Sequence, residues 1–190
     1  MNIVLASASP RRRELLTMLG VRDFKVIPAV GEEVLTSGMT AYDAVCSLAL
    51  AKAEEVSKLC AADDLIIAAD TVVALEGSIL GKPFDEADAF DMLSRLSGRI
   101  HRVYTGVAIM RGDVVISDYE RTCVRFRELN EREIKAYIAT GEPMDKAGAY
   151  GAQGKGALFV EGIEGDFFNV MGLPLCRLSK MLEKLGVSLL

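Results

Sequence analysis

The run Leu65–Leu75, LIIAADTVVAL, restricts the fold of this chain more than any other segment. Aliphatic and β-branched residues occupy both faces of this segment, which is typical of a central strand that is covered on both sides. A strand of this kind needs packing layers above and below it, as in proteins that combine a sheet with helices. Together with the elements expected around it, this run predicts a mixed α/β sheet with flanking helices, wrapped around a cleft.

Hydrophobic periodicity and capping residues predict the other elements. Helices are expected from Pro10, at residues 41–58 after a Thr40 cap, at 85–96, at 130–139 and from Pro174. Strands are expected at residues 2–6, 24–28 and 157–163, and a long hairpin is expected to join 101–110 to 114–127. An apolar stripe in the last helix predicts core packing for Leu175, Leu178, Leu182 and Leu185.

The composition indicates an ordinary globular protein. The 190 residues are 51% hydrophobic and 26% charged, which predicts a single domain over residues 1–190. The four cysteines are widely spaced and form no C-x-x-C pair, so we expect buried thiols in a reducing compartment. No apolar run approaches the length of a membrane span, and no signal peptide is expected. These features predict a cytoplasmic protein that binds no membrane.

The charge narrows the class of partner. A formal net charge of −5 argues against a general nucleic-acid binder, but it allows a small anionic ligand in a local basic site. His101 is the only histidine, which makes a serine–histidine triad and a histidine-rich metal site improbable. Hydrolytic chemistry in this chain would therefore depend on carboxylates, lysines and arginines.

The segment between the first strand and the first helix gathers hydroxyls and cations. Ser7 and Ser9 precede Pro10, and Arg11, Arg12 and Arg13 follow it. A helix N-terminus already favours an anion, so this segment predicts a phosphate-binding site. The alternative is an ordinary N-cap by Ser9, followed by solvated arginines.

Two charged residues stand in apolar surroundings. Asp70 interrupts the central strand, where an ionised carboxylate costs several kcal/mol (roughly) unless it is paired, metal-bound or exposed to a cleft. The alternative role of Asp70 is to cap a turn or to bond the backbone at a bend in the strand. Lys52 stands among small and apolar residues of the second helix, so it needs an anionic partner or must extend to solvent.

Other candidates lie in loops. Lys82, between Gly81 and Pro83, could offer a charge to a phosphate, or the tripeptide could be only a turn. Glu32 and Glu33 are either both solvated, or one of them shares a divalent cation with Asp70. Such carboxylate ligands suit Mg²⁺ or Mn²⁺.

The segment 145–154 is rich in glycine and allows a ligand to approach the backbone closely. Tyr150 could stack on that ligand and Gln153 could bind a base edge. The alternative is a structural loop with a tyrosine in the core.

Taken in order, five motifs closely resemble the Maf family of nucleotide pyrophosphatases: LASASPRRRELL, AADTVV, GKP, GEPMDKAGAYGAQG and NVMGLPL. The resemblance spans nearly the whole chain. It implies an elongated mixed α/β sheet around a central cleft, related to the inosine triphosphatase fold. It also implies cleavage of a nucleoside triphosphate between its α- and β-phosphates with the help of a divalent metal, and it suggests a homodimer.

The resemblance assigns roles to matching positions. Asp70 matches the proposed proton acceptor, and Ser7, Arg12, Lys52 and Lys82 match the polar lining of the cleft. Arg11, Thr71 and Gln153 match the positions that separate substrate subgroups, and here they follow the subgroup that prefers dTTP and UTP. Ser9 is expected to add a hydrogen bond to the triphosphate.

One position departs from the family. Gly31 stands where the family often has an aspartate before the glutamate, so either Glu32 or Glu33 approaches the metal. We expect Glu32 and Asp70 to hold Mg²⁺ or Mn²⁺ while Asp70 orients or deprotonates the attacking water. Because the family is also linked with inhibition of septum formation, a nucleotide-binding regulator with little turnover is the alternative function.

Overall fold

The expected central strand is present as β3 (Leu65–Leu75), and nine of its eleven residues are buried. It belongs to a computed structural model that describes residues 2–21, 23–31 and 38–190. Contacts divide the chain into two units. The first comprises Met1–Asp70, Thr105–Glu120 and Gly172–Leu190, and the second comprises Thr71–Tyr104 and Arg121–Met171. Three strands contribute residues to both units. The expectation of a single domain stays a prediction.

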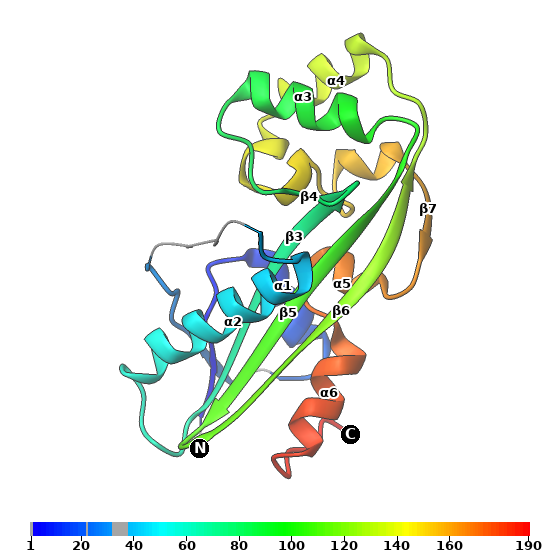
Figure 1. The fold of residues 1–190 in the computed structure, drawn as a ribbon. Coiled ribbons are helices and arrows are strands. Elements are labelled where there is room, and N and C mark those ends of the chain that lie inside the picture. Colours follow the sequence, from blue (N-terminus) through cyan, green and yellow to red (C-terminus); the bar gives the residue numbers. More distant parts are fainter. Residues whose placement is uncertain (1, 22, 32–37) are drawn as a thin grey trace. The chain divides into compact units, whose positions relative to one another are not determined.

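The described strands form a mixed sheet (Figure 1). In the first unit, β1 (Ile3–Leu5) pairs in parallel with both β2 (Phe24–Val26) and β3. In the second unit, β4 (Ser78–Leu80) pairs antiparallel with β3, and β7 (Val160–Glu164) pairs antiparallel with β6. The hairpin strands are β5 (Ile100–Arg111) and β6 (Val114–Phe126), and the order along the sheet is β2-β1-β3-β5-β6-β7.

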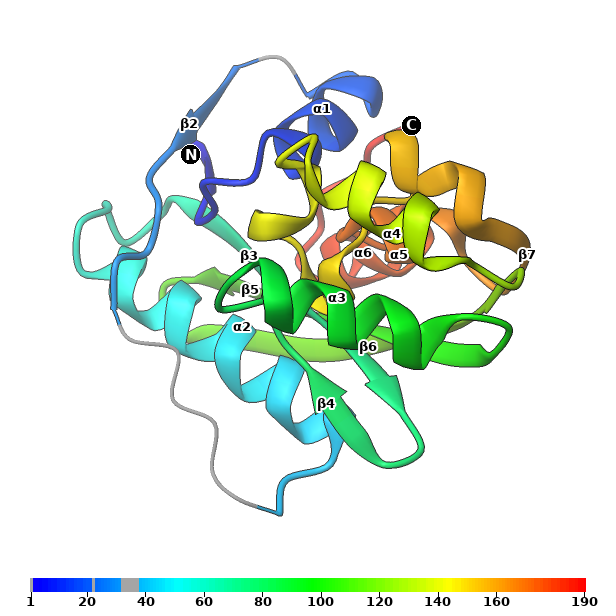
Figure 2. The ribbon, with the colours of Figure 1, turned by 90° about the horizontal axis from the view of Figure 1, so that it is seen from above.

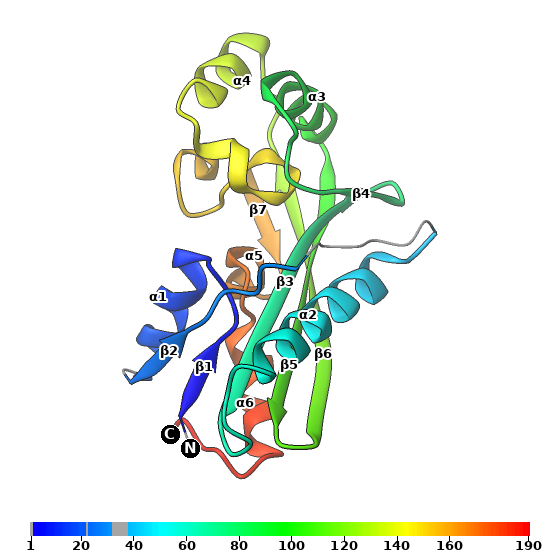
Figure 3. The same cartoon turned by 90° about the vertical axis from the view of Figure 1, so that its left-hand side faces the viewer.

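Helices cover both sides of the strands in the first unit. Figures 2 and 3 show α2 (Ala41–Ser57) on one side and both α1 (Pro10–Met18) and α6 (Leu175–Glu183) on the other. The α2 side is a core of small and branched residues, namely Val4, Ala6, Ala49, Ala53, Val56, Ile66, Ala68 and Ala108. The leucine stripe at the C-terminus is buried as expected, with Leu178 fully so.

Gly106 allows α2 to lie close to β5. A Cβ atom at this position would be 2.2 Å from the carbonyl oxygen of Val45 and 2.8 Å from the backbone nitrogen of Cys46. Because these are backbone atoms of a helix, no rotation of a side chain can relieve the overlap. The small residue at 106 is therefore a condition of this helix–sheet packing.

The second unit packs two helices over turns. It contains α3 (Glu86–Leu96), α4 (Glu131–Ile138) and α5 (Phe167–Met171), with 3₁₀ turns at Glu142–Asp145, Ala147–Ala149 and Lys155–Phe159. Figure 1 shows α3 and α4 side by side above the yellow turns. The core of this unit is aromatic, and ring contacts join Phe126 to His101, Tyr150 and Phe159.

Most element predictions are confirmed, and the capping residues explain why. The Thr40 side chain accepts a hydrogen bond from the backbone N–H of Asp43, and Asp85 and Asn130 cap α3 and α4 in the same way. The strand predicted at 157–163 is wrong at its start, because residues 157–159 belong to a 3₁₀ turn and the strand begins at Val160. The short elements β4 and α5 carry no periodic signal, because periodicity is weak over so few residues.

No described helix is both long enough and apolar enough to cross a membrane. All four cysteines are free thiols, as their spacing predicts. The expectation that they are buried is wrong, because Cys46, Cys60 and Cys123 are only half-buried and Cys176 is exposed.

Candidate functional site

Arg12 is held in place by hydrogen bonds rather than extended into solvent. Its Nε donates to the carbonyl oxygen of Gly172 at 2.7 Å, and its Nη1 donates to the Oγ of Ser7 at 3.1 Å. Both Arg12 and Ser7 are buried. Because a guanidinium offers five donors in a fixed plane, these two bonds fix its orientation. The structure thus brings together two of the predicted residues and excludes a solvated Arg12.

The neighbouring predicted residues are more exposed. Ser9 occupies the N-cap position of α1, but its side chain makes no capping hydrogen bond. Its backbone N–H instead donates to Ser7 Oγ at 3.2 Å. Arg11 and Ser9 are half-buried, whereas Arg13 is exposed. The alternative of an ordinary N-cap by the Ser9 hydroxyl is therefore wrong, whereas Pro10 begins the helix as predicted.

Lys52 and Asp70 form an ion pair within the first unit. The ammonium of Lys52, on α2, contacts a carboxylate oxygen of Asp70, on β3. Their side chains are 17% and 9% exposed. The positive charge of Lys52 offsets the cost of removing the Asp70 carboxylate from water. The pair explains how both charged side chains are accommodated among apolar residues, since Lys52 has an anionic partner and Asp70 has a cationic one.

The segment before the predicted acidic ligands is anchored by Glu55. Its carboxylate accepts hydrogen bonds from the backbone N–H groups of Val30 at 2.8 Å and Gly31 at 3.1 Å. A Cβ atom at Gly31 would lie 2.8 Å from this carboxylate, and an aspartate there would add a like charge. The departure from the family pattern at Gly31 therefore has a local reason. Glu32 and Glu33 lie outside the described residues, so the structure does not place the predicted second metal ligand.

The second unit contains Thr71, Lys82 and Gln153. Thr71 is half-buried on β3 directly after Asp70, whereas Lys82 and Gln153 are exposed in loops. The backbone joins the two loops, because the N–H of Gly148 donates to the carbonyl oxygen of Gly81 at 2.9 Å. The turn that contains Lys82 is thus tied to the start of the glycine-rich segment. The structure does not show what the Lys82 and Gln153 side chains bind, so their binding roles remain predictions.

Glu142 organises the glycine-rich segment, and sequence reasoning missed it. Its carboxylate accepts hydrogen bonds from the backbone N–H groups of Lys155 at 2.9 Å and Gly156 at 3.2 Å, and from the Tyr137 hydroxyl at 2.9 Å. Partial burial opposes ionisation, but these three bonds together lower the pKa of Glu142. Glu142 lies in one of the recognised motifs, which was the only signal in the sequence.

Tyr150 is a core residue, so the structural alternative is correct for this side chain. It is 6% exposed, and its hydroxyl lies 2.7 Å from Nε2 of His101. His101 is 1% exposed, and burial lowers its pKa to about 4. The imidazole is therefore neutral near pH 7, and it packs in the core against Phe126 and Tyr150. Stacking of Tyr150 on a ligand, which the sequence left open, is not available to a ring enclosed in this way.

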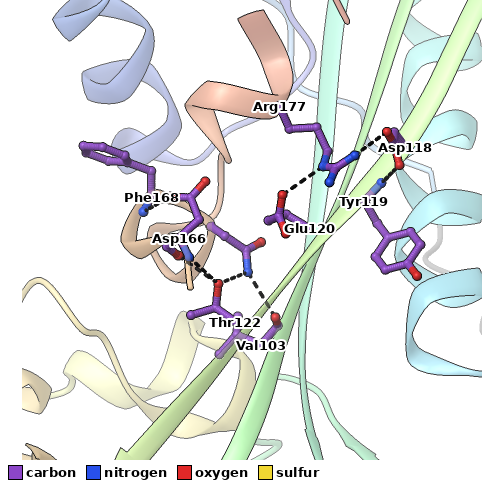
Figure 4. A network of polar contacts seen from close by, with 9 residues as sticks. Val103, Asp118, Tyr119, Glu120, Thr122, Asp166, Phe168 and Arg177 are labelled. Carbon is purple, nitrogen blue, oxygen red and sulfur yellow. Dashed lines mark hydrogen bonds and ion pairs between the residues drawn. The ribbon is translucent and has the colours of Figure 1, made fainter. Parts of the chain in front are cut away.

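The NVMGLPL motif has a structural role in each unit. In the second unit, the fully buried Asn169 donates through Nδ2 to the carbonyl oxygen of Val103 at 3.1 Å and to Thr122 Oγ1 at 2.9 Å. The Thr122 hydroxyl also donates to the carbonyl oxygen of Asp166 at 2.9 Å, as Figure 4 shows. In the first unit, Gly172 supplies the carbonyl that accepts from Arg12. The motif thus links strands β5 and β6 to α5 and fixes the Arg12 side chain.

A separate ionic group ties α6 to β6 in the first unit. Arg177 donates to Asp118 at 2.5 Å through Nη1 and to Glu120 at 3.0 Å through Nε, and Figure 4 shows both contacts. Nearly a third of the Arg177 side chain is exposed. Both carboxylates form ion pairs with Arg177, so this group has a structural role in holding α6 against β6.

Solved structures support the fold. The structure of the Staphylococcus aureus Ham1 protein matches 97% of this chain and 99% of its own, with a TM-score of 0.50 and 14% sequence identity. A HAM1 protein from Coxiella burnetii matches the same shares with a TM-score of 0.52 and 16% identity. At such low identity the likeness concerns the fold alone, and it confirms the expected relation to this mixed α/β class.

Sequence comparison supports a narrower relationship. A protein of Bacillus cereus (strain ZK / E33L), named dTTP/UTP pyrophosphatase, is 50% identical over 185 residues, which are 97% of this chain and 96% of that protein. A protein of Bacillus anthracis with the same name is 49% identical over the same shares. The family described as Maf-like protein matches residues 2–185. Ser7, Arg12 and Asp70, which form the contacts described above, lie in motifs of this family. On these matches, this chain belongs to the Maf family.

Proposed function

We propose that this protein hydrolyses dTTP and UTP to the nucleoside monophosphate and pyrophosphate. The observation that carries the proposal is 50% identity, over 97% of the chain, to relatives named dTTP/UTP pyrophosphatase. The reaction consumes one water molecule. A water oxygen forms a bond to the α-phosphorus, the bond from that phosphorus to the α,β-bridging oxygen breaks, and the electron pair leaves with pyrophosphate.

Asp70 is the proposed proton acceptor for that water. Its carboxylate is the charged group that β3 places in a buried position, and the Lys52 ammonium compensates that charge. A carboxylate paired with a lysine ammonium keeps its orientation and can accept a proton as the water attacks. Lys52 is then positioned to neutralise charge that develops on the phosphates as the leaving group departs.

The remaining predicted cations bind the triphosphate. Arg12 is orientated by Ser7 and by the Gly172 carbonyl oxygen, which supports a role in fixing the phosphates rather than attracting them loosely. Arg11, Lys82 and the Ser9 hydroxyl are proposed to add further contacts. Because phosphoryl transfer depends mainly on positioning and charge stabilisation, loss of any of these cations should slow the reaction.

A divalent cation is proposed as cofactor, with Asp70 and Glu32 as its protein ligands. Among the described residues, no group of three histidine, cysteine, aspartate or glutamate side chains could hold a metal by itself. Asp70 still fits Mg²⁺ or Mn²⁺, because Mg²⁺ is usually bound through one or two carboxylates together with substrate phosphates. When bound, the metal would neutralise phosphate charge and lower the pKa of the attacking water.

Thr71 and Gln153 are proposed to select the pyrimidine. The hydroxyl and amide groups of these residues both donate and accept hydrogen bonds, as the edge of a thymine or uracil requires. A site of pyrimidine size excludes a purine, and unpaired polar groups add to that penalty. The free thiols support a reducing compartment, and we propose the cytoplasm. A homodimer that binds no nucleic acid stays a prediction.

The proposal is tested with four substrates in one assay: dTTP, UTP, 7-methyl-GTP and inosine triphosphate, each with Mg²⁺. The account predicts the fastest release of pyrophosphate from dTTP and UTP. In ¹⁸O-labelled water the label should enter the monophosphate, since the attack is at the α-phosphorus. Preference for either purine nucleotide would contradict the substrate assignment. Binding of dTTP without turnover would favour the regulatory alternative.

A further inference from the structure

The proposed base-selecting residue Gln153 lies within residues 151–156. One end of this segment bonds the Glu142 carboxylate directly, and the other end bonds it through the Tyr137 hydroxyl. On the C-terminal side, the N–H groups of Lys155 and Gly156 donate to Glu142. On the N-terminal side, the N–H of Gly151 donates to the Tyr137 hydroxyl at 3.1 Å. That hydroxyl in turn donates to Glu142, so both sides of the segment depend on the same group.

The glycines of this segment are fitted to the carboxylate. A Cβ atom at Gly154 would lie between 2.4 and 2.6 Å from the three carboxyl atoms of Glu142. One at Gly156 would be 2.7 Å from the Tyr137 hydroxyl and 2.7 Å from the carbonyl oxygen of Gly151. The glycine spacing, which by itself suggested close approach to a ligand, instead allows close approach to Glu142 and Tyr137.

The turn at the tip is short. The N–H of Gly154 donates to the carbonyl oxygen of Gly151 at 3.3 Å, which leaves Ala152 and Gln153 between the two bonded residues. Gln153 is exposed, whereas Glu142 is half-buried and its oxygens accept hydrogen bonds from three donors. The position of the Gln153 backbone is thus set by Glu142, while its amide remains available to a ligand.

We propose that Glu142 is a positioning residue for substrate selectivity, because it holds residues 151–156 in the conformation that presents Gln153 to the pyrimidine. This inference rests on the proposed function. A loop that relaxes by a fraction of an ångström no longer matches the hydrogen-bonding edge of the base, which removes the advantage of pyrimidines over purines. Glu142 acts through Gln153, and it touches neither the phosphates nor the reacting atoms.

The substitution Glu142→Gln is the sharpest probe, since it keeps the shape of the side chain. Both carboxylate oxygens accept from N–H or O–H donors, so an NH₂ group at either position faces a donor and opens one side of the loop. We expect the ratio of kcat/KM for dTTP to that for dGTP to fall about fivefold to tenfold, the range in which a lost hydrogen bond acts. Glu131→Gln is the matched control, because Glu131 is exposed and bonded to Lys135 in the same unit.

A double variant separates positioning from general damage. If Glu142 acts through Gln153, Glu142→Gln should not lower the selectivity ratio further in a Gln153→Ala background. Tyr137→Phe, which keeps the ring packed on Phe159 but removes the hydroxyl, should reproduce part of the loss even if Glu142→Gln folds poorly. Unfolding curves of each variant report on folding separately from selectivity.

Two results overturn the inference alone: a pyrimidine preference that survives Glu142→Gln and Tyr137→Phe, or a further loss of selectivity in the double variant. A wild-type protein that releases no pyrophosphate from dTTP or UTP overturns the proposed function, and the inference fails with it. The wild-type measurement therefore distinguishes the two failures.

Discussion

The ammonium of Lys52 on α2 and the carboxylate of Asp70 on β3 form an ion pair inside the first unit, with side chains only 17% and 9% exposed. The two residues come from different elements, and each is surrounded in sequence by apolar neighbours. At such low exposure, the loss of one partner leaves the other charge without compensation. The pair therefore links the stability of the first unit to the residue proposed to accept the proton from water.

Replacing Lys52 with Met should destabilise the protein by about 1–3 kcal/mol, because it leaves the Asp70 charge buried and unpaired. The double variant Lys52→Met with Asp70→Asn should be less destabilised than the sum of the two single changes. Urea unfolding of all four proteins measures this coupling. Additive effects of the two changes would show that the ion pair contributes no interaction energy.

The sequence indicated that Lys52 needs an anionic partner or access to solvent. It also indicated that Asp70 needs a partner, a metal, a cleft or a backbone hydrogen bond, but not that the two residues are partners of one another. A charge within an apolar run shows a local need, whereas its solution depends on which helix packs over which strand. The helix caps at Thr40, Asp85 and Asn130 were predictable because a cap depends on residues three positions apart. Most helices and strands could therefore be predicted from local sequence patterns. The long-range contacts of the site could be identified only from the structure.

Arg12→Lys should weaken both folding and substrate binding. A lysine cannot donate to the Gly172 carbonyl and to Ser7 Oγ with the fixed geometry of a guanidinium. We expect a loss of stability of about 1–2 kcal/mol and a higher KM for dTTP. Thermal unfolding and steady-state kinetics measure the two effects. Arg13→Lys, at an exposed position on the same helix, is the control and should change neither.

Gly106→Ala should be strongly destabilising. The added methyl group would overlap the Val45 carbonyl group of α2, so the helix must move away from β5. We expect a loss of about 2–4 kcal/mol in the free energy of unfolding. Gly81→Ala is the control, since a Cβ atom there meets nothing within 4 Å. Equal stability of the two variants in urea would contradict the described packing of α2.

His101 should make stability depend on pH. Burial lowers its folded-state pKa from 6.5 to about 4, so the unfolded chain takes up a proton first as the pH falls. Its contribution is fully present above pH 6.5 and is lost between pH 6.5 and 4, by about 3 kcal/mol in total. His101→Gln cannot titrate and should show a correspondingly smaller loss over that range. Parallel curves for both proteins would contradict the neutral, buried imidazole.

The roles of Glu142 and Asn169 could not be predicted from the sequence. Both lie in recognised motifs, yet their partners are mainly backbone groups of residues brought near by the fold. A backbone N–H or carbonyl carries no residue-specific signal, so periodicity and composition do not reveal these contacts. The same limit explains the misplaced start of the strand at Val160, where a 3₁₀ turn interrupts an apolar run.

Asp64→Asn offers a matched control for the proposed proton acceptor. Asp64 is a second buried aspartate of the first unit, and its carboxylate accepts hydrogen bonds from Asn2 and from the Ala61 backbone. The change from carboxylate to amide is chemically identical at Asp64 and Asp70. Only the Asp70 variant should lose turnover, by roughly 10²–10⁴-fold, the range typical of general acid–base catalysis.

The most direct measurement is the identity and rate of the products formed from dTTP and Mg²⁺ by the wild-type, Asp70→Asn and Asp64→Asn proteins. The account predicts equal amounts of dTMP and pyrophosphate from the wild-type and Asp64→Asn proteins, with turnover abolished or nearly so in Asp70→Asn. Release of dTDP and phosphate, or near-wild-type turnover by Asp70→Asn while it remains folded, would contradict it.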